Sequence, residues 1–189
     1  ERLPGIHCIA MDMRGHGRSD RPPPPYPWLA FGEDVAAVAE ALGLRGALGV
    51  GHSKGGHAVI NGAFLNPSAF AALLLIDPVV APRARYSLPA PLTQHPSAKR
   101  RNHWASRGEF FERLAGREPF SLWDPLVLRD YCEFGLLPRP DGNGYELACP
   151  PEIESLLYSG GAGEADPYPA IESLELPVRI LRARARGEG

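Results

Sequence analysis

The chain has 189 residues, of which 44% are hydrophobic and 22% charged, and this argues against a disordered or fibrous protein. A chain of this length can bury a sizeable core without disulfides or metals, and one domain is the default expectation. The 20 Lys and Arg residues nearly balance the 22 Asp and Glu residues, which argues against the basic surface of a nucleic-acid-binding protein. The 21 Gly and 21 Pro residues indicate that loops and turns take up much of the chain.

Short apolar strands alternate with helices in the first half of the chain. Residues 6–11 form an apolar run that ends at a Gly-rich loop, which predicts a buried strand. A helix is expected over residues 31–42, a strand over 47–51, a helix of small residues over 57–65 and a buried strand over 70–76. This alternation predicts parallel pairing in an α/β sheet.

The second half of the chain has apolar residues at helical spacing and no convincing strand between residues 83 and 158. Pro150 and Pro151 favour the start of a helix, because Pro is tolerated in the first turn. The apolar run over residues 176–181 resembles a fourth strand. The expected elements are helices over residues 109–114, 126–131 and 150–157, a loop over 160–169 and a strand over 176–181.

The cysteines and the apolar runs limit the kind of protein. Cys8, Cys132 and Cys149 are odd in number and far apart, which predicts reduced thiols and a cytoplasmic location rather than a disulfide framework or a zinc ribbon. No His, Cys, Asp and Glu set has metal-ligand spacing, so we expect no metal and no cofactor. The longest apolar run, about residues 69–76, is shorter than the roughly 20 residues that a membrane span requires.

One motif carries chemistry. The sequence Gly51-His52-Ser53-Lys54-Gly55 matches G-x-S-x-G between an expected strand and an expected helix. Such a turn lifts the Ser53 hydroxyl above the sheet and aims the Lys54 backbone N–H at an oxygen that gains charge during acyl transfer. The alternative is a Gly-rich turn with a solvated Ser. A dinucleotide fingerprint fails because its third glycine falls on Lys54 or Asp20, and a phosphate-binding loop is absent.

Three segments, in chain order, resemble the α/β-hydrolase superfamily. Residues 12–20 are similar to the loop after the family's fourth strand, residues 50–56 to its nucleophile elbow, and residues 73–78 to its sixth strand. The resemblance implies an α/β-hydrolase fold, a mostly parallel sheet flanked by helices with an inserted helical cap. The implied division is a core over residues 1–80, a cap over 81–170 and a return to the core over 171–189.

The resemblance also implies a mechanism. Ser53 would attack an acyl carbon, a His would take its proton, a carboxylate would orient that His, and the Lys54 N–H would supply half of the oxyanion hole. Asp77 fits the acid after the sixth strand, although a structural Asp before Pro78 is an alternative, and Glu188 is a second candidate acid. None of the six His residues fits the base, which should follow the last strand.

Two kinds of function remain open on these residues. The first is a serine hydrolase of small or medium carboxylic esters or related acyl compounds, and C–C hydrolysis, thioester hydrolysis or perhydrolysis would use the same residues. The second is a non-catalytic or truncated hydrolase-like protein, since the sheet implied by the resemblance is incomplete in these 189 residues and we expect them not to fold alone as an enzyme. We expect a small-molecule acyl substrate and neither a nucleic acid nor a membrane as partner, while the oligomeric state stays open.

Overall fold

The computed structural model describes residues 3–87, 95–159 and 165–183. Contacts among the residues divide the chain into two compact units. The hairpin unit consists of Glu1–Pro23 and Ser97–Glu154, and the sheet unit of Pro24–Pro96 and Ser155–Gly189.

The sheet unit contains a three-stranded parallel sheet in the order β1-β2-β5. β1 pairs with β2 so that His52 lies opposite Ile76, and β2 pairs with β5 so that Ile76 lies opposite Leu181. The three strands therefore end at one edge, and the expected parallel α/β arrangement is confirmed. The bounds are β1 Ala47–His52, β2 Phe70–Ile76 and β5 Val178–Leu181.

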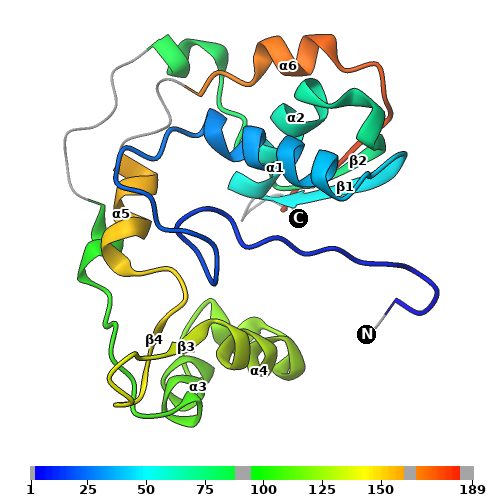
Figure 1. Ribbon diagram of the computed structural model, residues 1–189. Coiled ribbons are helices and arrows are strands. Elements are labelled where there is room, and N and C mark those ends of the chain that lie inside the picture. The colour runs from blue at the N-terminus through cyan, green and yellow to red at the C-terminus, as the bar shows by residue number, and fades with distance from the viewer. Residues whose placement is uncertain (1–2, 88–94, 160–164, 184–189) are drawn as a thin grey trace, which may run out of the picture. The chain divides into compact units, whose positions relative to one another are not determined.

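Three helices lie on one side of this sheet: α1 Leu29–Ala41, α2 Lys54–Leu65 and α6 Tyr168–Ser173 (Figure 1). Ile60 and Ala63 of α2, Leu73 and Leu75 of β2, and Ala170 of α6 form a common buried cluster. α1 approaches α2 closely, since a Cβ at Gly62 would stand 2.4 Å from Cγ1 of Val35. Burial of one helical layer against the strands is what holds this unit together.

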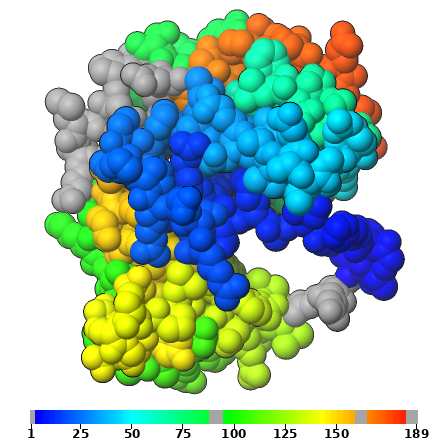
Figure 2. Space-filling model, viewed as in Figure 1, coloured from blue at the N-terminus to red at the C-terminus, as the bar shows by residue number. Residues whose placement is uncertain are grey.

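The other face of the sheet carries exposed apolar residues. Leu48 and Val50 alternate with the two glycines of β1 and are 59% and 53% exposed. The space-filling view shows the chain from α1 into β1 running along the molecular surface (Figure 2). In the next strand, Leu74 and Ile76 are only half-buried.

The hairpin unit packs two helices against a short antiparallel hairpin. α3 Arg107–Ala115 begins where the Ser106 side chain accepts the Glu109 N–H, and α4 Pro125–Phe134 begins where Asp124 accepts the Leu126 N–H. Both helices confirm the expected ones. A hairpin of β3 Leu136–Pro138 and β4 Tyr145–Leu147 follows. The core consists of Trp104, Phe110, Leu114, Leu128, Cys132, Leu136 and Leu147.

Three expectations for the elements were wrong or incomplete. Residues 6–11 form no strand, and Ile6 and Ile9 are 63% and 45% exposed, because the described residues place no strand beside them to complete a ladder. The hairpin β3–β4 and the helix α6 were not expected. The expected helix after Pro150 is confirmed as α5 Pro151–Ser159. Residues 160–164 of the expected loop lie outside the described residues.

The longest described helix, α1, has 13 residues. Because a span needs about 20 apolar residues, none of the helices in the described ranges could cross a membrane. The core–cap boundaries expected at residues 80 and 170 remain a prediction, since a division into compact units says nothing about which part covers a site.

Candidate active site

Ser53 occupies the turn between β1 and α2 with a backbone conformation that L-residues avoid. Its φ is 52° and its ψ is −121°, and it is the N-cap of α2. Such a conformation costs on the order of 1–3 kcal/mol and persists only where the surroundings enforce it. Here the Ser53 N–H donates to the Ile76 carbonyl (3.0 Å), and the Ser53 carbonyl accepts from the Gly56 and Val79 N–H groups (3.0 and 3.1 Å). The turn that carries the Ser53 hydroxyl is thus fixed by hydrogen bonds to β2, to the start of α2 and to the segment after β2.

Gly51 makes this turn possible. A Cβ at Gly51 would stand 2.4 Å from the Gly55 carbonyl oxygen and 2.7 Å from the Cα of Gly56. Both are backbone atoms, which cannot move aside as a flexible side chain would. The first glycine of the motif is therefore required by the close approach of the helix to the strand.

Lys54 begins α2 directly after Ser53. The first N–H groups of a helix have no acceptor within the helix and lie at the positive end of its dipole, which suits the role expected for the Lys54 amide. The side chain points elsewhere: Nζ is buried and lies 4.0 Å from the centroid of the Phe31 ring in α1. A desolvated ammonium over an aromatic face gains about 2 kcal/mol. The Lys54 side chain therefore joins α2 to α1.

Asp77 directly follows β2, as Ser53 directly follows β1. Because His52 and Ile76 are paired, the two residues emerge side by side at the carboxyl edge of the sheet. Asp77 also has a positive φ, of 44°, and its N–H donates to the Leu181 carbonyl at 2.7 Å. Its side chain is exposed. The structure thus brings the expected nucleophile and the expected acid to neighbouring strand ends.

His57 lies one turn into α2 and is 1% exposed. Its Nε2 is 2.9 Å from the Ala165 carbonyl, which can only accept, so Nε2 carries the proton. Its Nδ1 is 3.5 Å from the Asn61 amide nitrogen, and the Trp28 ring packs edge-on at 5.3 Å. Burial lowers the pKa of His57 below its usual 6.5, and the hydrogen bond to Ala165 opposes this only in part. His57 is therefore a neutral core residue.

Other imidazoles also have partners away from Ser53 and Asp77. His16 bonds to the Arg14 carbonyl, His103 bonds to the Asn143 carbonyl, and His95 stacks on Tyr158 at 4.2 Å. The second candidate acid, Glu188, lies outside the described residues. Among the residues that are described, no group of three His, Cys, Asp or Glu side chains could hold a metal ion.

The segment after β2 supports the elbow in a way that the sequence analysis missed. Val79 donates to the Ser53 carbonyl, and a Cβ at Gly56 would stand 2.7 Å from Cβ of Pro78. The Asp77-Pro78 pair was a visible turn signal, but its contact with the elbow depends on the pairing of β1 with β2. Chemically, the arrangement places the Ser53 hydroxyl on a strained turn, with the start of α2 next to it and the Asp77 carboxylate after the end of the neighbouring strand.

Comparisons with known proteins agree with this fold. A family model described as "Alpha/beta hydrolase family" matches residues 1–187. Among solved structures, the peroxisomal alpha-beta-hydrolase Lpx1 of Saccharomyces cerevisiae superposes with a TM-score of 0.68 at 18% identity, over 92% of this chain and 59% of that one. At this identity the likeness shows a shared fold.

Two curated relatives are similar in sequence. The chain is 48% identical over 52 residues to a bifunctional esterase/perhydrolase of Acinetobacter calcoaceticus, which is 28% of this chain and 19% of that protein. It is 27% identical over 186 residues to a 2-(acetamidomethylene)succinate hydrolase of Mesorhizobium japonicum, which is 94% of this chain and 60% of that protein. The chain spans less than two thirds of the length of the curated relatives that it matches.

Proposed function

The chain belongs to the alpha/beta hydrolase family, and from that premise we propose that it supplies the nucleophile of a serine hydrolase of small or medium carboxylic esters. The observation that carries the proposal is the strained φ of 52° at Ser53, on the turn between β1 and α2. Non-glycine residues hold such conformations mainly at functional sites. The relative named an esterase/perhydrolase supports an ester as the substrate class.

In the proposed reaction, Ser53 Oγ attacks the ester carbonyl carbon and its proton passes to a base. The carbonyl oxygen becomes an oxyanion, and the Lys54 N–H donates a hydrogen bond to it. The C–O bond to the leaving alcohol then breaks, the alcohol takes up the proton, and an acyl group stays on Ser53. Water releases the acid in the second half of the cycle.

Asp77 is the proposed carboxylate that orients the base. It directly follows β2, which pairs with β1, and Ser53 directly follows β1. We assign the base to none of the described histidines. His57 in particular is excluded, since both of its ring nitrogens already have partners within the core.

An active-site-directed fluorophosphonate tests the proposal on this chain and on the full-length product of its gene. We expect labelling of the wild type, none of Ser53→Ala, and unchanged labelling of Ser68→Ala, a matched exposed serine whose Oγ bonds to Asn66. Labelling that survives Ser53→Ala would disprove the nucleophile. A folded full-length protein that takes no label would favour a non-catalytic hydrolase-like protein.

Perhydrolysis is the second candidate, favoured by the esterase/perhydrolase name of one relative. In that reaction hydrogen peroxide replaces water as the acyl acceptor, and the acyl-enzyme yields a peracid. Peracid formation from a short carboxylic acid and peroxide, lost in Ser53→Ala, would support it. Because another relative is named a 2-(acetamidomethylene)succinate hydrolase, hydrolytic substrates other than simple esters stay among the alternatives.

We further propose a cytoplasmic protein whose partner is its small-molecule acyl substrate. Support comes from Cys8, Cys132 and Cys149, which are all free thiols. Fractionation of the native host with an antibody tests the location, and recovery in a secreted or membrane fraction would overturn it.

A further inference from the structure

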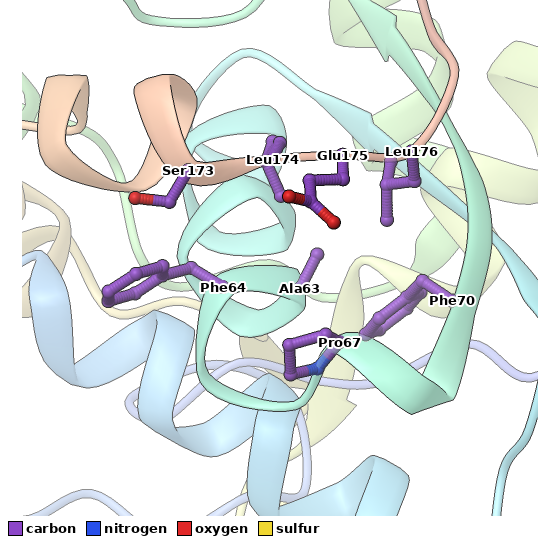
Figure 3. A pocket seen from close by; sticks show the side chains of 8 residues that line it. All are labelled: Ala63, Phe64, Pro67, Phe70, Ser173, Leu174, Glu175 and Leu176. Carbon is purple, nitrogen blue, oxygen red and sulfur yellow. The ribbon is translucent and has the colours of Figure 1, made fainter.

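A pocket lies in the sheet unit at the end of α2 remote from Ser53. Ser53 stands at the start of α2, whereas the pocket is formed by the last turn of α2, the start of β2 and the stretch after α6 (Figure 3). Twelve helical residues separate the two ends by about 18 Å. The pocket has a volume of about 350 Å³ and is lined by Ala63, Phe64, Pro67, Phe70, Ser173, Leu174, Glu175 and Leu176.

Negative charge and negative partial charge converge on this pocket. Glu175 contributes a carboxylate, and Figure 3 shows it between the side chains of Leu174 and Leu176. The carboxyl end of α2 adds the negative end of the helix dipole. Residue 67 is Pro and has no N–H to donate to the Ala63 carbonyl four residues earlier. None of the described residues that line the pocket is Lys or Arg.

Two aromatic rings complete the lining. Phe64 and Phe70 line the pocket to the two sides of the Glu175 carboxylate in Figure 3, and Phe64 is 43% exposed and so accessible from solvent. The faces of aromatic rings attract cations, and quaternary ammonium groups are bound in this way. The carboxylate and the helix end therefore favour a cationic ligand, and the two rings add aromatic surface to the same pocket.

The frame of the pocket is already ordered. Ala63 belongs to the buried cluster that joins α2, α6 and β2, and the turn after α2 is held by the Ala69 N–H donating to the Asn66 carbonyl and the Gly46 N–H donating to the Ser68 carbonyl. On the opposite wall the Ser173 hydroxyl donates to the Pro169 carbonyl at 2.8 Å. Little ordering of the protein is needed for binding, which favours affinity for a small ligand.

We propose that this pocket binds a small organic ammonium ion, with its cationic head near Glu175 and its apolar part against Phe64 and Phe70. The volume is at the lower end of small-molecule sites and suits a ligand of a few carbon atoms rather than a peptide. An anionic ligand would meet Glu175 and the helix end, and a neutral one would leave both unused. The inference is independent of the activity proposed for Ser53.

Choline and its neutral carbon isostere, 3,3-dimethylbutan-1-ol, test the proposal because they share shape and differ in charge. Each is titrated into the ¹⁵N-labelled full chain, and amide shifts of residues 63–66, 68–70 and 173–176 are followed. We expect choline to bind at least about threefold more tightly than the alcohol. Equal binding of the two probes, or no shift at these amides with either, would overturn the proposal.

Two variants and one control separate the contributions. Glu175→Gln keeps the shape and should weaken choline binding about threefold. Phe64→Ala removes apolar contact area and should weaken it about two- to fivefold. Glu172→Gln should have no effect, since that exposed carboxylate pairs with Arg83 outside the pocket. The far-ultraviolet circular dichroism of each variant checks its fold. Equal weakening by Glu175→Gln and Glu172→Gln would show nonspecific attraction and contradict the site.

Discussion

Ser53 and Asp77 are the two non-glycine residues with positive φ in the described part of the chain. At Ser53 the combination of φ 52° with ψ −121° mirrors an ordinary extended conformation, which glycine adopts freely. The strain therefore comes from the Cβ atom, and a substitution that removes Cβ should relieve it.

We predict that Ser53→Gly is more stable than Ser53→Ala by about 1 kcal/mol in the free energy of unfolding, although neither reacts with a fluorophosphonate. Both variants lose the hydroxyl, and only the first loses the Cβ. Urea denaturation of the two proteins measures the difference. A Ser53→Gly protein that is less stable than Ser53→Ala would show that the turn is not strained.

His57 should make the stability depend on pH. Its pKa is lowered in the folded protein by burial, whereas the unfolded chain takes up a proton near 6.5. Below that pH the unfolded state binds a proton that the folded state does not. The free energy of unfolding should therefore decrease as the pH falls below about 6.5, by up to about 1.4 kcal/mol per pH unit until His57 itself protonates.

Denaturation at several pH values measures this slope, and NMR titration of the ring gives the pKa directly. The slope should flatten in His57→Gln and stay unchanged in His7→Gln, which alters an exposed histidine. A ring of His57 that titrates above 6.5 in the folded protein would contradict the prediction.

At the scale of elements, the elbow depends on a helix that starts within contact distance of its own strand. Gly51→Ala places a methyl group against the backbone of Gly55 and Gly56, so we predict a loss of about 2 kcal/mol or more in the free energy of unfolding. Gly116→Ala is the control, because a Cβ there meets nothing within 4 Å. Similar losses in the two variants, measured by urea denaturation, would refute the close-approach argument.

Elements with several turns or several buried apolar residues could be predicted from the sequence. β2 was expected with its observed limits because Phe70–Ile76 is a continuous apolar run. The hairpin β3–β4 was missed because strands of three residues, one ending in Pro138, are too short for an alternating pattern. Its turn chemistry around Asp141 and Gly142 was the available signal.

The site could be predicted only as far as its local part. Ser53 and Lys54 lie within one motif, so strand–turn–helix context was sufficient to place them. The role of Val79 could not be predicted, because it depends on the register between strands that are 18 residues apart in the chain. The prediction of a strand over residues 6–11 was wrong for a related reason, because a strand is defined by its neighbour as well as by its own apolar residues.

At the scale of the whole molecule, the uncovered sheet face should govern association of this chain. Leu48 and Val50 lie on an edge strand, where exposed apolar side chains and unpaired backbone groups favour pairing between molecules. We predict that the 189-residue chain self-associates and that Leu48→Lys with Val50→Lys shifts it toward monomer. Sedimentation velocity measures the change. Leu122→Lys, at an even more exposed residue of the hairpin unit, should leave association unaltered, and an equal effect there would contradict the prediction.

The hydrogen bonds at the carboxyl edge of the sheet determine which backbone amide is released first when this edge unfolds locally. The Ser53 amide is held by β2, whereas the Asp77 amide is held by Leu181 at the end of β5, a strand of four exposed residues. Fraying of β5 would free the Asp77 amide while that of Ser53 stays bonded. Local unfolding would thus reach the candidate acid before the candidate nucleophile. The orientation of the Asp77 carboxylate is therefore less protected than that of the Ser53 hydroxyl.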